Sequence, residues 1–155
     1  MRPLRVYVDT SVFGGCFDGE FASESTRFFD LVRADRVVVL ISPVVVDEIG
    51  NAPAEVRDFF RSLSADSVTA VELTQEIIEL RDAYVEAGIV SPRFVDDATH
   101  VAAATVARAD AIVSWNFKHI VRVDKMRAYN QVNLGAGFGL ISIVSPREVR
   151  FDDDE

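Results

Sequence analysis

Acidic and amide side chains occur at four separated places in this chain, and their chemistry is that of a divalent-metal site. In chain order these residues are Asp9, Glu48, Asp97 and Asn116. Mg²⁺ and Mn²⁺ prefer oxygen ligands and keep several waters, so a few such side chains are enough to hold them. Beside a phosphodiester, these ions neutralise the phosphate, activate a water and stabilise the leaving oxygen. The gaps between the four residues are too wide for a local motif, so the fold has to bring them together.

Other kinds of catalytic site have little support in the sequence. His100 and His119 have no third histidine, and Cys16 is the only cysteine, so a zinc site is not expected. There is no Gly-x-x-x-x-Gly-Lys loop and no Gly-x-Ser-x-Gly elbow. His100 lies three residues after Asp97 and shares its helix face, but a packed or locally bonded histidine is the more common outcome at such a position.

Strand and helix patterns alternate along the chain, and this alternation decides where the acidic residues lie. Continuous apolar runs at Leu4–Val8, Val37–Ile41 and Ala111–Val113 are typical of strands that helices cover on both faces. We therefore expect one three-layer α/β/α domain over residues 1–150, with a central parallel sheet of four or five strands. The remaining residues, 151–155, read as an acidic, solvated tail.

Local signals place the other elements. Ser42-Pro43 and Thr74 are typical helix starts, and Gly88 is a typical helix end. Ser23 or Ser25 is expected to cap an early helix, and Asp124 a late one. The expected helices cover about residues 23–34, 43–50, 54–63, 75–87, 94–109 and 124–134, and weaker strands cover 67–73 and 140–144.

This order of elements predicts a common location for the acidic residues. In open parallel α/β sheets, ligands bind beyond the carboxyl ends of the strands, where the strand order reverses. Asp9 directly follows the first strand, and Ser114 and Asn116 directly follow the strand Ala111–Val113. Glu48 and Asp97 lie on helices connected to strands of the same sheet. We therefore expect one site at this edge of the sheet.

Composition limits the classes of partner. No apolar stretch approaches the roughly 20 residues that span a bilayer, and no signal peptide is recognisable, so a cytoplasmic protein without a membrane partner is expected. The net charge of −9 argues against nucleic-acid binding. Two features weaken this argument: four of the charges lie in the tail, and a carboxylate site is acidic until its cations bind.

Four segments, in order, resemble the PIN-domain ribonucleases. They are Val-Tyr-Val-Asp9-Thr10-Ser11, Pro43-Val-Val-Val-Asp47-Glu48, Asp97-Ala-Thr-His100-Val-Ala and Ile-Val-Ser114-Trp-Asn116-Phe-Lys-His119. The resemblance implies an endoribonuclease that depends on Mg²⁺ or Mn²⁺ and hydrolyses RNA phosphodiester bonds. It also implies a VapC-like toxin of a type II toxin–antitoxin pair, with an antitoxin protein as a partner and often a homodimer.

The resemblance also implies roles for single residues. It selects Glu48 over its neighbour Asp47, and Asp97 over Asp96. The family's fourth acidic position is Asn116 here, which brings an oxygen ligand but no charge, so one metal ion is better supported than two. Ser11, Ser114 and Asp96 are expected to support the metal ligands by hydrogen bonds. RNA phosphates are expected to contact the basic residues after the site loop, namely Lys118, Arg122 and Lys125, although a solvated helix face is the plainer interpretation of these three.

Two alternatives remain at this stage. A catalytically weak or inert module of the same fold, acting in RNA or protein binding, would fit both Asn116 and the net charge of −9. A phosphatase with Asp9 as a covalent nucleophile would usually have a second aspartate two residues later. Ser11 occupies that position, so this alternative is the weaker one.

Overall fold

A single parallel sheet of five strands forms the centre of the molecule. The computed structural model describes residues 2–152. The strands lie in the order β3-β2-β1-β4-β5, and every neighbouring pair is parallel. Their bounds are β1 Leu4–Val8, β2 Val37–Ile41, β3 Val68–Ala70, β4 Ala111–Val113 and β5 Ser142–Val144. The predicted parallel sheet is therefore confirmed, with five strands.

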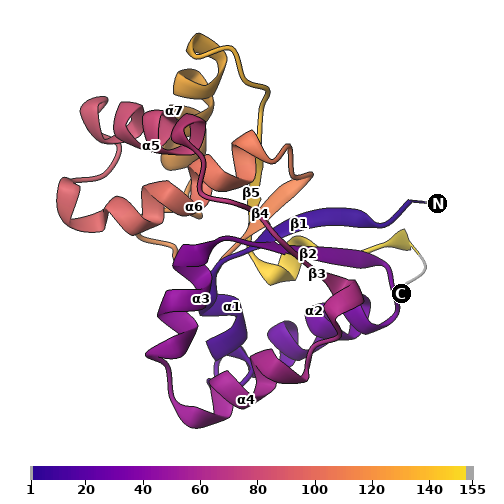
Figure 1. Ribbon diagram of the computed structural model, residues 1–155. Coiled ribbons are helices and arrows are strands. Elements are labelled where there is room, and N and C mark those ends of the chain that lie inside the picture. Colours follow the sequence, from indigo (N-terminus) through magenta and orange to yellow (C-terminus); the bar gives the residue numbers. More distant parts are fainter. Residues whose placement is uncertain (1, 153–155) are drawn as a thin grey trace.

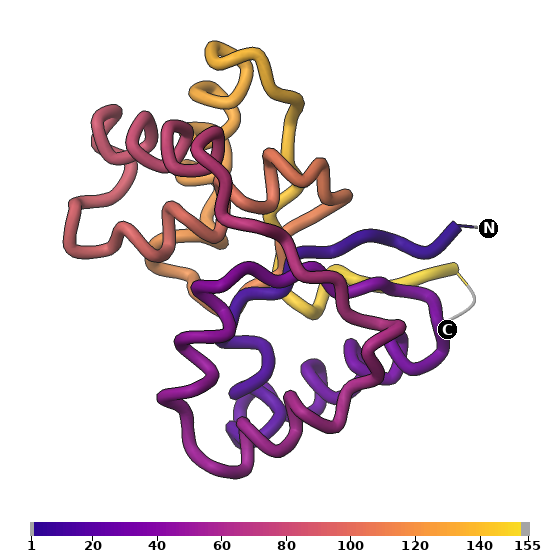
Figure 2. Tube along the Cα trace, in the orientation of Figure 1, coloured from indigo at the N-terminus to yellow at the C-terminus, as the bar shows by residue number. Residues whose placement is uncertain are grey.

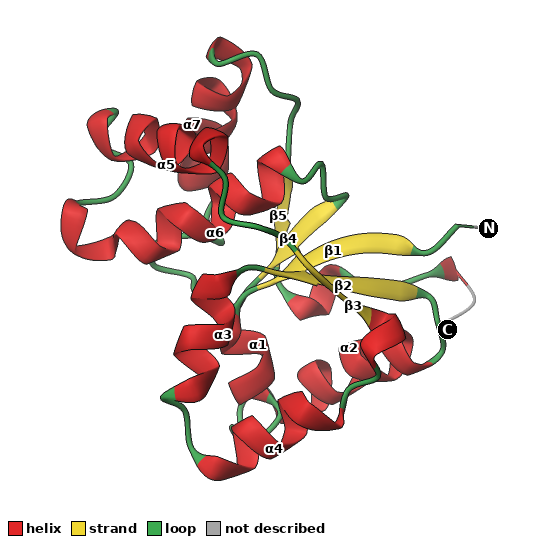
Figure 3. Ribbon diagram, viewed as in Figure 1, coloured by secondary structure: helices red, strands yellow, loops and turns green. Residues whose placement is uncertain are grey.

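Seven α-helices cover the two faces of this sheet within residues 2–152. They are α1 Thr10–Gly15, α2 Ala22–Arg33, α3 Pro43–Gly50, α4 Ala54–Ser62, α5 Gln75–Glu86, α6 Val95–Val106 and α7 Val123–Gly135. Helices α1 to α4 lie on one side and α5 to α7 on the other, which confirms the three-layer α/β/α architecture (Figure 1, Figure 3). Short 3-10 helices occur at Ala65–Ser67, Pro92–Phe94 and Pro146–Glu148.

The two helical layers pack by different means. On the side of α1 to α4, phenylalanine rings interlock: the Phe13 ring lies 5.2 Å from Phe29 and 5.3 Å from Phe60, centroid to centroid. On the other side, buried alanines of α6 let this helix approach its neighbours closely. Both layers bury their apolar faces against the same sheet, which is why β1, β2 and β4 are almost entirely apolar.

Helix α1 begins directly after Asp9, and no sequence pattern predicted it. It is six residues long and contains two glycines, which lower helix propensity. Gly15 is required here, because a Cβ atom at this position would lie 2.5 Å from Ser25 Oγ and 2.7 Å from Trp115 Nε1. Those two atoms are joined by a 2.8 Å hydrogen bond, donated by the indole. The tight contact therefore fixes α1 against α2 and against the loop that follows β4.

Some predicted helix caps are wrong. Ser25 lies inside α2, whose N-cap residue is Phe21, and Arg122 rather than Asp124 is the N-cap residue of α7. Thr74 does cap α5, since its hydroxyl accepts the Ile77 amide. Serine and aspartate are good caps only where the chain enters the helix at that residue, and the sequence does not fix that point.

The chain ends described by the structure lie away from the carboxyl ends of the strands. Figure 2 shows the start of β1 and the last described residues on the same side of the molecule. Phe151 packs against the core with the Arg36 guanidinium 4.1 Å from its ring centroid, so the folded part extends past the predicted boundary at residue 150. Of the predicted tail, Asp152 is exposed and residues 153–155 lie outside the described residues. Among residues 2–152, none of the helices combines the length and apolar character needed to cross a membrane.

Candidate metal site

The strand order reverses between β1 and β4, and the first residues after these two strands lie side by side. Val8 pairs with Val113 in the sheet, so Asp9 and Ser114 occupy equivalent positions just beyond it. The Asp9 carboxylate is only 5% exposed. Its Oδ2 atom accepts hydrogen bonds from Ser11 Oγ at 2.8 Å and Ser114 Oγ at 2.7 Å. These two serines hold the Asp9 carboxylate in place, and their support of a metal ligand stays a prediction.

Glu48 and His100 complete a compact group with Asp9. Glu48 lies on α3, and its Oε1 atom accepts a 2.8 Å hydrogen bond from Thr10 Oγ1. His100 Nε2, from the opposite helical layer, lies 2.7 Å from the same Oε1 atom and 3.3 Å from Asp9 Oδ1. One ligand atom from each of Asp9, Glu48 and His100 lies within 4.8 Å of the other two. The fold thus brings three distant segments to one point.

His100 is held from its other side by Tyr7. The Tyr7 hydroxyl lies 2.8 Å from His100 Nδ1 and 2.7 Å from Ser42 Oγ, and all three residues are buried. Ser42 occupies the N-cap position of α3, as expected, but its side chain makes no capping hydrogen bond. Its hydroxyl is used by Tyr7 instead. Burial raises the pKa of Tyr7 far above its ordinary value, so the residue stays a neutral hydroxyl.

The charges in this group are unevenly balanced. Burial raises the pKa of Glu48, but the hydrogen bond and charge of His100 and the bond from Thr10 outweigh it, so the pKa is lowered. Burial lowers the pKa of His100, yet the Asp9 and Glu48 carboxylates raise it overall. Burial and the charge of Asp9 raise the pKa of Asp97 to about 6. The site thus contains three carboxyl groups, those of Asp9, Glu48 and Asp97, and one imidazole, that of His100.

Asp97 and Asn116 lie next to this group, but their roles differ from each other. The Asn116 side chain lies close enough to the Asp97 carboxylate to offset part of the rise in the pKa of Asp97. Its Oδ1 atom accepts the backbone amides of Lys118 at 3.2 Å and His119 at 2.9 Å. The oxygen therefore closes a turn in the loop after β4. The role of Asn116 as a metal ligand stays a prediction.

The other predicted residues are placed less favourably. Asp96 is exposed and makes no hydrogen bond or ion pair with the described part of the chain, so the expected support from this residue is not seen. Arg122 pairs with Asp124 at 2.6 Å and 2.9 Å. Lys125 donates to the Ile89 carbonyl. Of the three basic residues predicted to meet RNA, Lys118 alone is exposed and has no carboxylate or carbonyl partner within residues 2–152.

Sequence reasoning missed Tyr7 and gave His100 too small a role. The spacing of His100 from Asp97 was visible in the sequence, but it predicted only a shared helix face. His100 and Tyr7 make hydrogen bonds that join α6 to β1, to α3 and to the residue after β2, and no local sequence pattern predicts these bonds.

Comparison with known proteins agrees with this architecture. The family model described as "PIN domain" matches residues 5–118. A solved toxin–antitoxin complex from Klebsiella pneumoniae contains a chain with 17% identity and a TM-score of 0.58, covering 77% of this chain and 93% of its own. A second structure, VapBC2 from Rickettsia felis bound to a DNA fragment from their promoter, has 16% identity and a TM-score of 0.52, covering 74% and 90%. None of the curated protein sequences matches this chain.

Proposed function

Because this chain belongs to the PIN domain family, whose model spans well over half of its length, we propose that it is a metal-dependent endoribonuclease. The observation that carries this proposal is the group of Asp9, Glu48 and His100 at the carboxyl edge of the sheet, where the strand order reverses. Open parallel sheets bind their ligands at this point. Asp97 supplies a third carboxylate beside the group.

The donor set fits Mg²⁺ or Mn²⁺. Asp9, Glu48 and Asp97 offer carboxylate oxygens, the ligands that these hard cations prefer. The raised pKa of Asp97 reflects burial and repulsion among carboxylates, which a bound cation would relieve. When bound, the ion supplies positive charge for the phosphate and a water that loses its proton near neutral pH. With Asn116 engaged in its turn, the residues support one ion better than two.

The remaining residues of the site orient the proposed ligands. Ser11 and Ser114 both bond to Asp9 Oδ2, which fixes the carboxylate plane. A carboxylate can only accept hydrogen bonds, so His100 Nε2 carries the hydrogen that it shares with Glu48. The Tyr7 hydroxyl can donate to a neutral His100 or accept from a charged one. The imidazole orientation is therefore preserved in both protonation states.

We further propose that the protein acts as the toxin of a toxin–antitoxin pair. The two similar solved structures are toxin–antitoxin assemblies, and they match over 90% or more of their own chains. The corresponding partner would be a co-expressed antitoxin protein that keeps the nuclease inactive. RNA in the cytoplasm would be the substrate, and the active form would be a homodimer.

An inert binding module is the second candidate, because two observations favour it. Asn116 stands where a fourth carboxylate would add charge, and two of the predicted RNA-contacting cations are bound within the protein. Such a module would retain the fold and bind RNA or protein without cleaving RNA. Cleavage measurements separate the two candidates.

The test is RNA cleavage by wild type and by variants at neighbouring positions. Glu48→Gln should reduce Mn²⁺-dependent cleavage by roughly 100-fold or more, since loss of a ligand should exceed the effect of losing its hydrogen-bonding support. Asp47→Asn is the matched control: it removes an exposed carboxylate one residue away and should leave the rate unchanged. Equal rates for both variants, or no cleavage by wild type with either ion, would rule out the proposed enzyme.

A further inference from the structure

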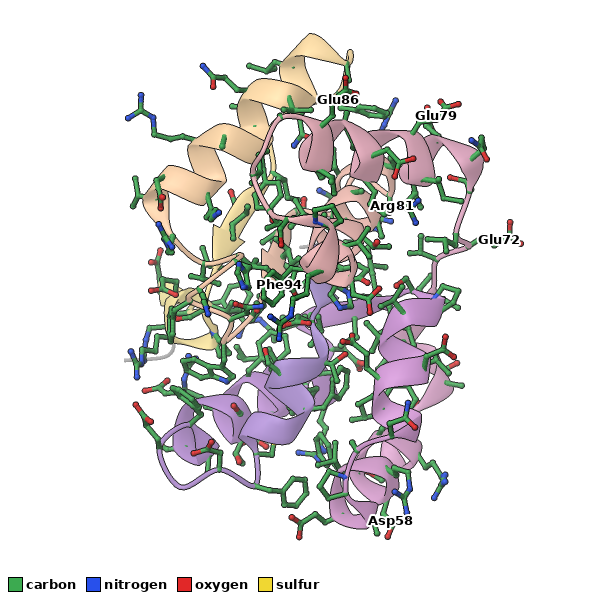
Figure 4. All side chains as sticks on the ribbon, turned by 90° about the vertical axis from the view of Figure 1, so that its left-hand side faces the viewer. Asp58, Glu72, Glu79, Arg81, Glu86 and Phe94 are labelled. Atoms are coloured by element: carbon green, nitrogen blue, oxygen red, sulfur yellow. The ribbon has the colours of Figure 1, made fainter. Side chains whose placement is uncertain are left out.

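Two aromatic rings and two cations form a patch beside the proposed metal site. We call it the stacking patch, and it consists of Arg93, Phe94, Lys118 and His119. The rings of Phe94 and His119 are stacked, with centroids 4.0 Å apart and planes 30° apart. The Arg93 guanidinium carbon lies 5.5 Å and Lys118 Nζ 6.0 Å from the Phe94 centroid. Figure 4 shows Phe94 near the middle of its face of the molecule, between the two helical layers.

The patch is fixed to the metal site by short connections. Phe94 is the residue immediately before α6, and Asp97 lies in the first turn of that helix. On the other side, the Asn116 side chain lies beside the Asp97 carboxylate, and its Oδ1 atom accepts the backbone amides of Lys118 and His119. A ligand on the patch would therefore lie within one helical turn of a proposed metal ligand. Asn116 lies between the stacking patch and the proposed metal site.

His119 has properties that packing alone does not require. Its Nε2 atom is covered but has no hydrogen-bond partner within residues 2–152, whereas buried polar atoms are normally paired. Partial burial and the nearby cations Lys118 and Lys125 lower its pKa, so the ring is neutral near pH 7. A neutral ring stacked on Phe94 adds a second flat aromatic surface to the patch, and both residues are partly exposed to solvent.

These features favour one kind of ligand over others. Flat rings flanked by cations bind unpaired bases by stacking while the cations contact neighbouring phosphates. Bases inside an RNA duplex are already stacked and their faces are inaccessible. A binder that relied on charge would need a broad basic surface, and this chain has a net charge of −9. We infer that the stacking patch binds an unpaired base of single-stranded RNA next to the cleaved bond.

This inference rests on the proposed ribonuclease function and makes it more specific. It gives Phe94 the role of positioning an unpaired base beside the proposed metal site. It also predicts a weak dependence of binding on salt. With Arg93 and Lys118 contacting two phosphates, the slope of log K against log salt should be about −1.4, at about −0.7 per contact.

The test is the binding of a short, labelled, mixed-sequence single-stranded RNA to an Asp9→Asn background that does not cleave it. In this background Phe94→Leu should weaken binding about tenfold, the effect of losing one stacked base, while Phe94→Tyr should bind like the parent. Lys118→Gln leaves the rings in place and should reduce the salt slope by about 0.7. The same RNA annealed to its complement should bind more weakly than the single strand.

The matched control is Phe151→Leu. This ring also carries a guanidinium, that of Arg36, but it lies far from the carboxyl edge of the sheet. The variant should bind RNA like the parent, and thermal melting of each variant shows whether it is folded. If the Asp9→Asn protein binds the RNA but Phe94→Leu and Lys118→Gln change nothing, the inference is wrong and the proposed nuclease stands. If wild type neither binds nor cleaves RNA, both are wrong.

Discussion

Two buried polar clusters lie in this fold, and they are built in opposite ways. The first is the metal-site cluster around Asp9, Glu48 and His100. The second, which we call the tyrosine cluster, consists of Tyr84, Thr105 and Asn133, at the packing of α5, α6 and α7. The tyrosine cluster is buried throughout, whereas in the metal-site cluster Asp9 and His100 are buried and Glu48 lies at the rim with a side chain that is 37% exposed. Only the first contains ionised groups.

The side chains of the tyrosine cluster provide hydrogen-bond partners for one another. The Tyr84 hydroxyl donates to Asn133 Oδ1, and Asn133 Nδ2 donates to Thr105 Oγ1 at 3.3 Å. Thr105 Oγ1 lies 3.4 Å from the Tyr84 oxygen, which closes a ring of three hydrogen bonds. Burial raises the pKa of Tyr84 far above its ordinary value, so every member stays neutral. Such a network specifies helix packing and has no unused capacity for a ligand.

In the metal-site cluster, the positive and negative charges do not balance. Two carboxylates, those of Asp9 and Glu48, contact the one imidazole. Burial and the charge of Asp9 raise the pKa of the third carboxyl, Asp97, to about 6. Unbalanced buried charge costs stability, and such arrangements gather at functional sites. The comparison teaches that burial of polar groups alone does not mark a site. A functional site is marked instead by charged side chains that no neighbouring group of opposite charge balances.

The largest expected effect is a loss of metal binding and RNA cleavage when a serine that supports the metal-site cluster is changed. Ser114→Ala removes the 2.7 Å hydrogen bond to Asp9 Oδ2 and should lower Mn²⁺ affinity and RNA cleavage by roughly 10- to 100-fold. Ser145→Ala is the control, because this buried serine bonds to Glu148 and touches none of the site carboxylates. Calorimetry and cleavage assays on both variants measure the effect. Equal Mn²⁺ affinity in the two variants would show that Ser114 does not support the site.

Changing the tyrosine cluster should affect stability instead. Tyr84→Phe leaves Asn133 Oδ1 without its donor, so the free energy of unfolding should fall by about 1–3 kcal/mol. Urea denaturation measures this change. Cleavage per folded molecule should be unaffected, because the cluster contacts none of the proposed metal ligands. A loss of Mn²⁺ affinity in Tyr84→Phe would mean that the two clusters are coupled, contrary to the comparison.

The smallest effect is a change in thermal stability, expected when one of the neighbouring carboxylates is replaced by an amide. A carboxyl whose pKa is raised by folding stabilises the fold below its unfolded pKa, and this contribution is lost as the pH rises through about 6. Asp97→Asn should therefore raise the melting temperature of the metal-free protein by about 2–4 °C at about pH 7.5, which allows for solvent screening of a half-buried group. At about pH 4 the difference should vanish.

Asp96→Asn is the control for this measurement, since it removes an exposed carboxylate on the same helix turn and should melt like wild type. Thermal melting of the metal-free proteins at both pH values gives the comparison. Lower stability of Asp97→Asn at both pH values would show that Asp97 is not under repulsion from its neighbours.

The sequence predicted the fold because its signals are periodic and local. Apolar runs and helix patterns alternate, and this implies a parallel sheet with Asp9 and Ser114 at one edge. Helix α1 was not predicted, since Gly14 and Gly15 mask it and only the packing of Ser25 and Trp115 explains why a glycine is needed.

The details of the site were less accessible to sequence reasoning. His100 and Tyr7 meet because α6 and β1 pack at one particular register, and residue spacing does not report side-chain direction across elements. The sequence suggested Asn116 as a metal ligand, and it did not show that the Asn116 oxygen also accepts two backbone amides of its own loop. Local backbone hydrogen bonds of this kind compete with any longer-range role of an asparagine.

The most direct test of the account is a calorimetric titration of the metal-free protein with Mn²⁺. Wild type should bind one ion, and Asp9→Asn should show no measurable binding while melting at a temperature close to that of wild type. This result would establish that the buried, uncompensated carboxylates hold a metal. An absence of binding by wild type, or equal binding by the folded Asp9→Asn protein, would contradict the claim.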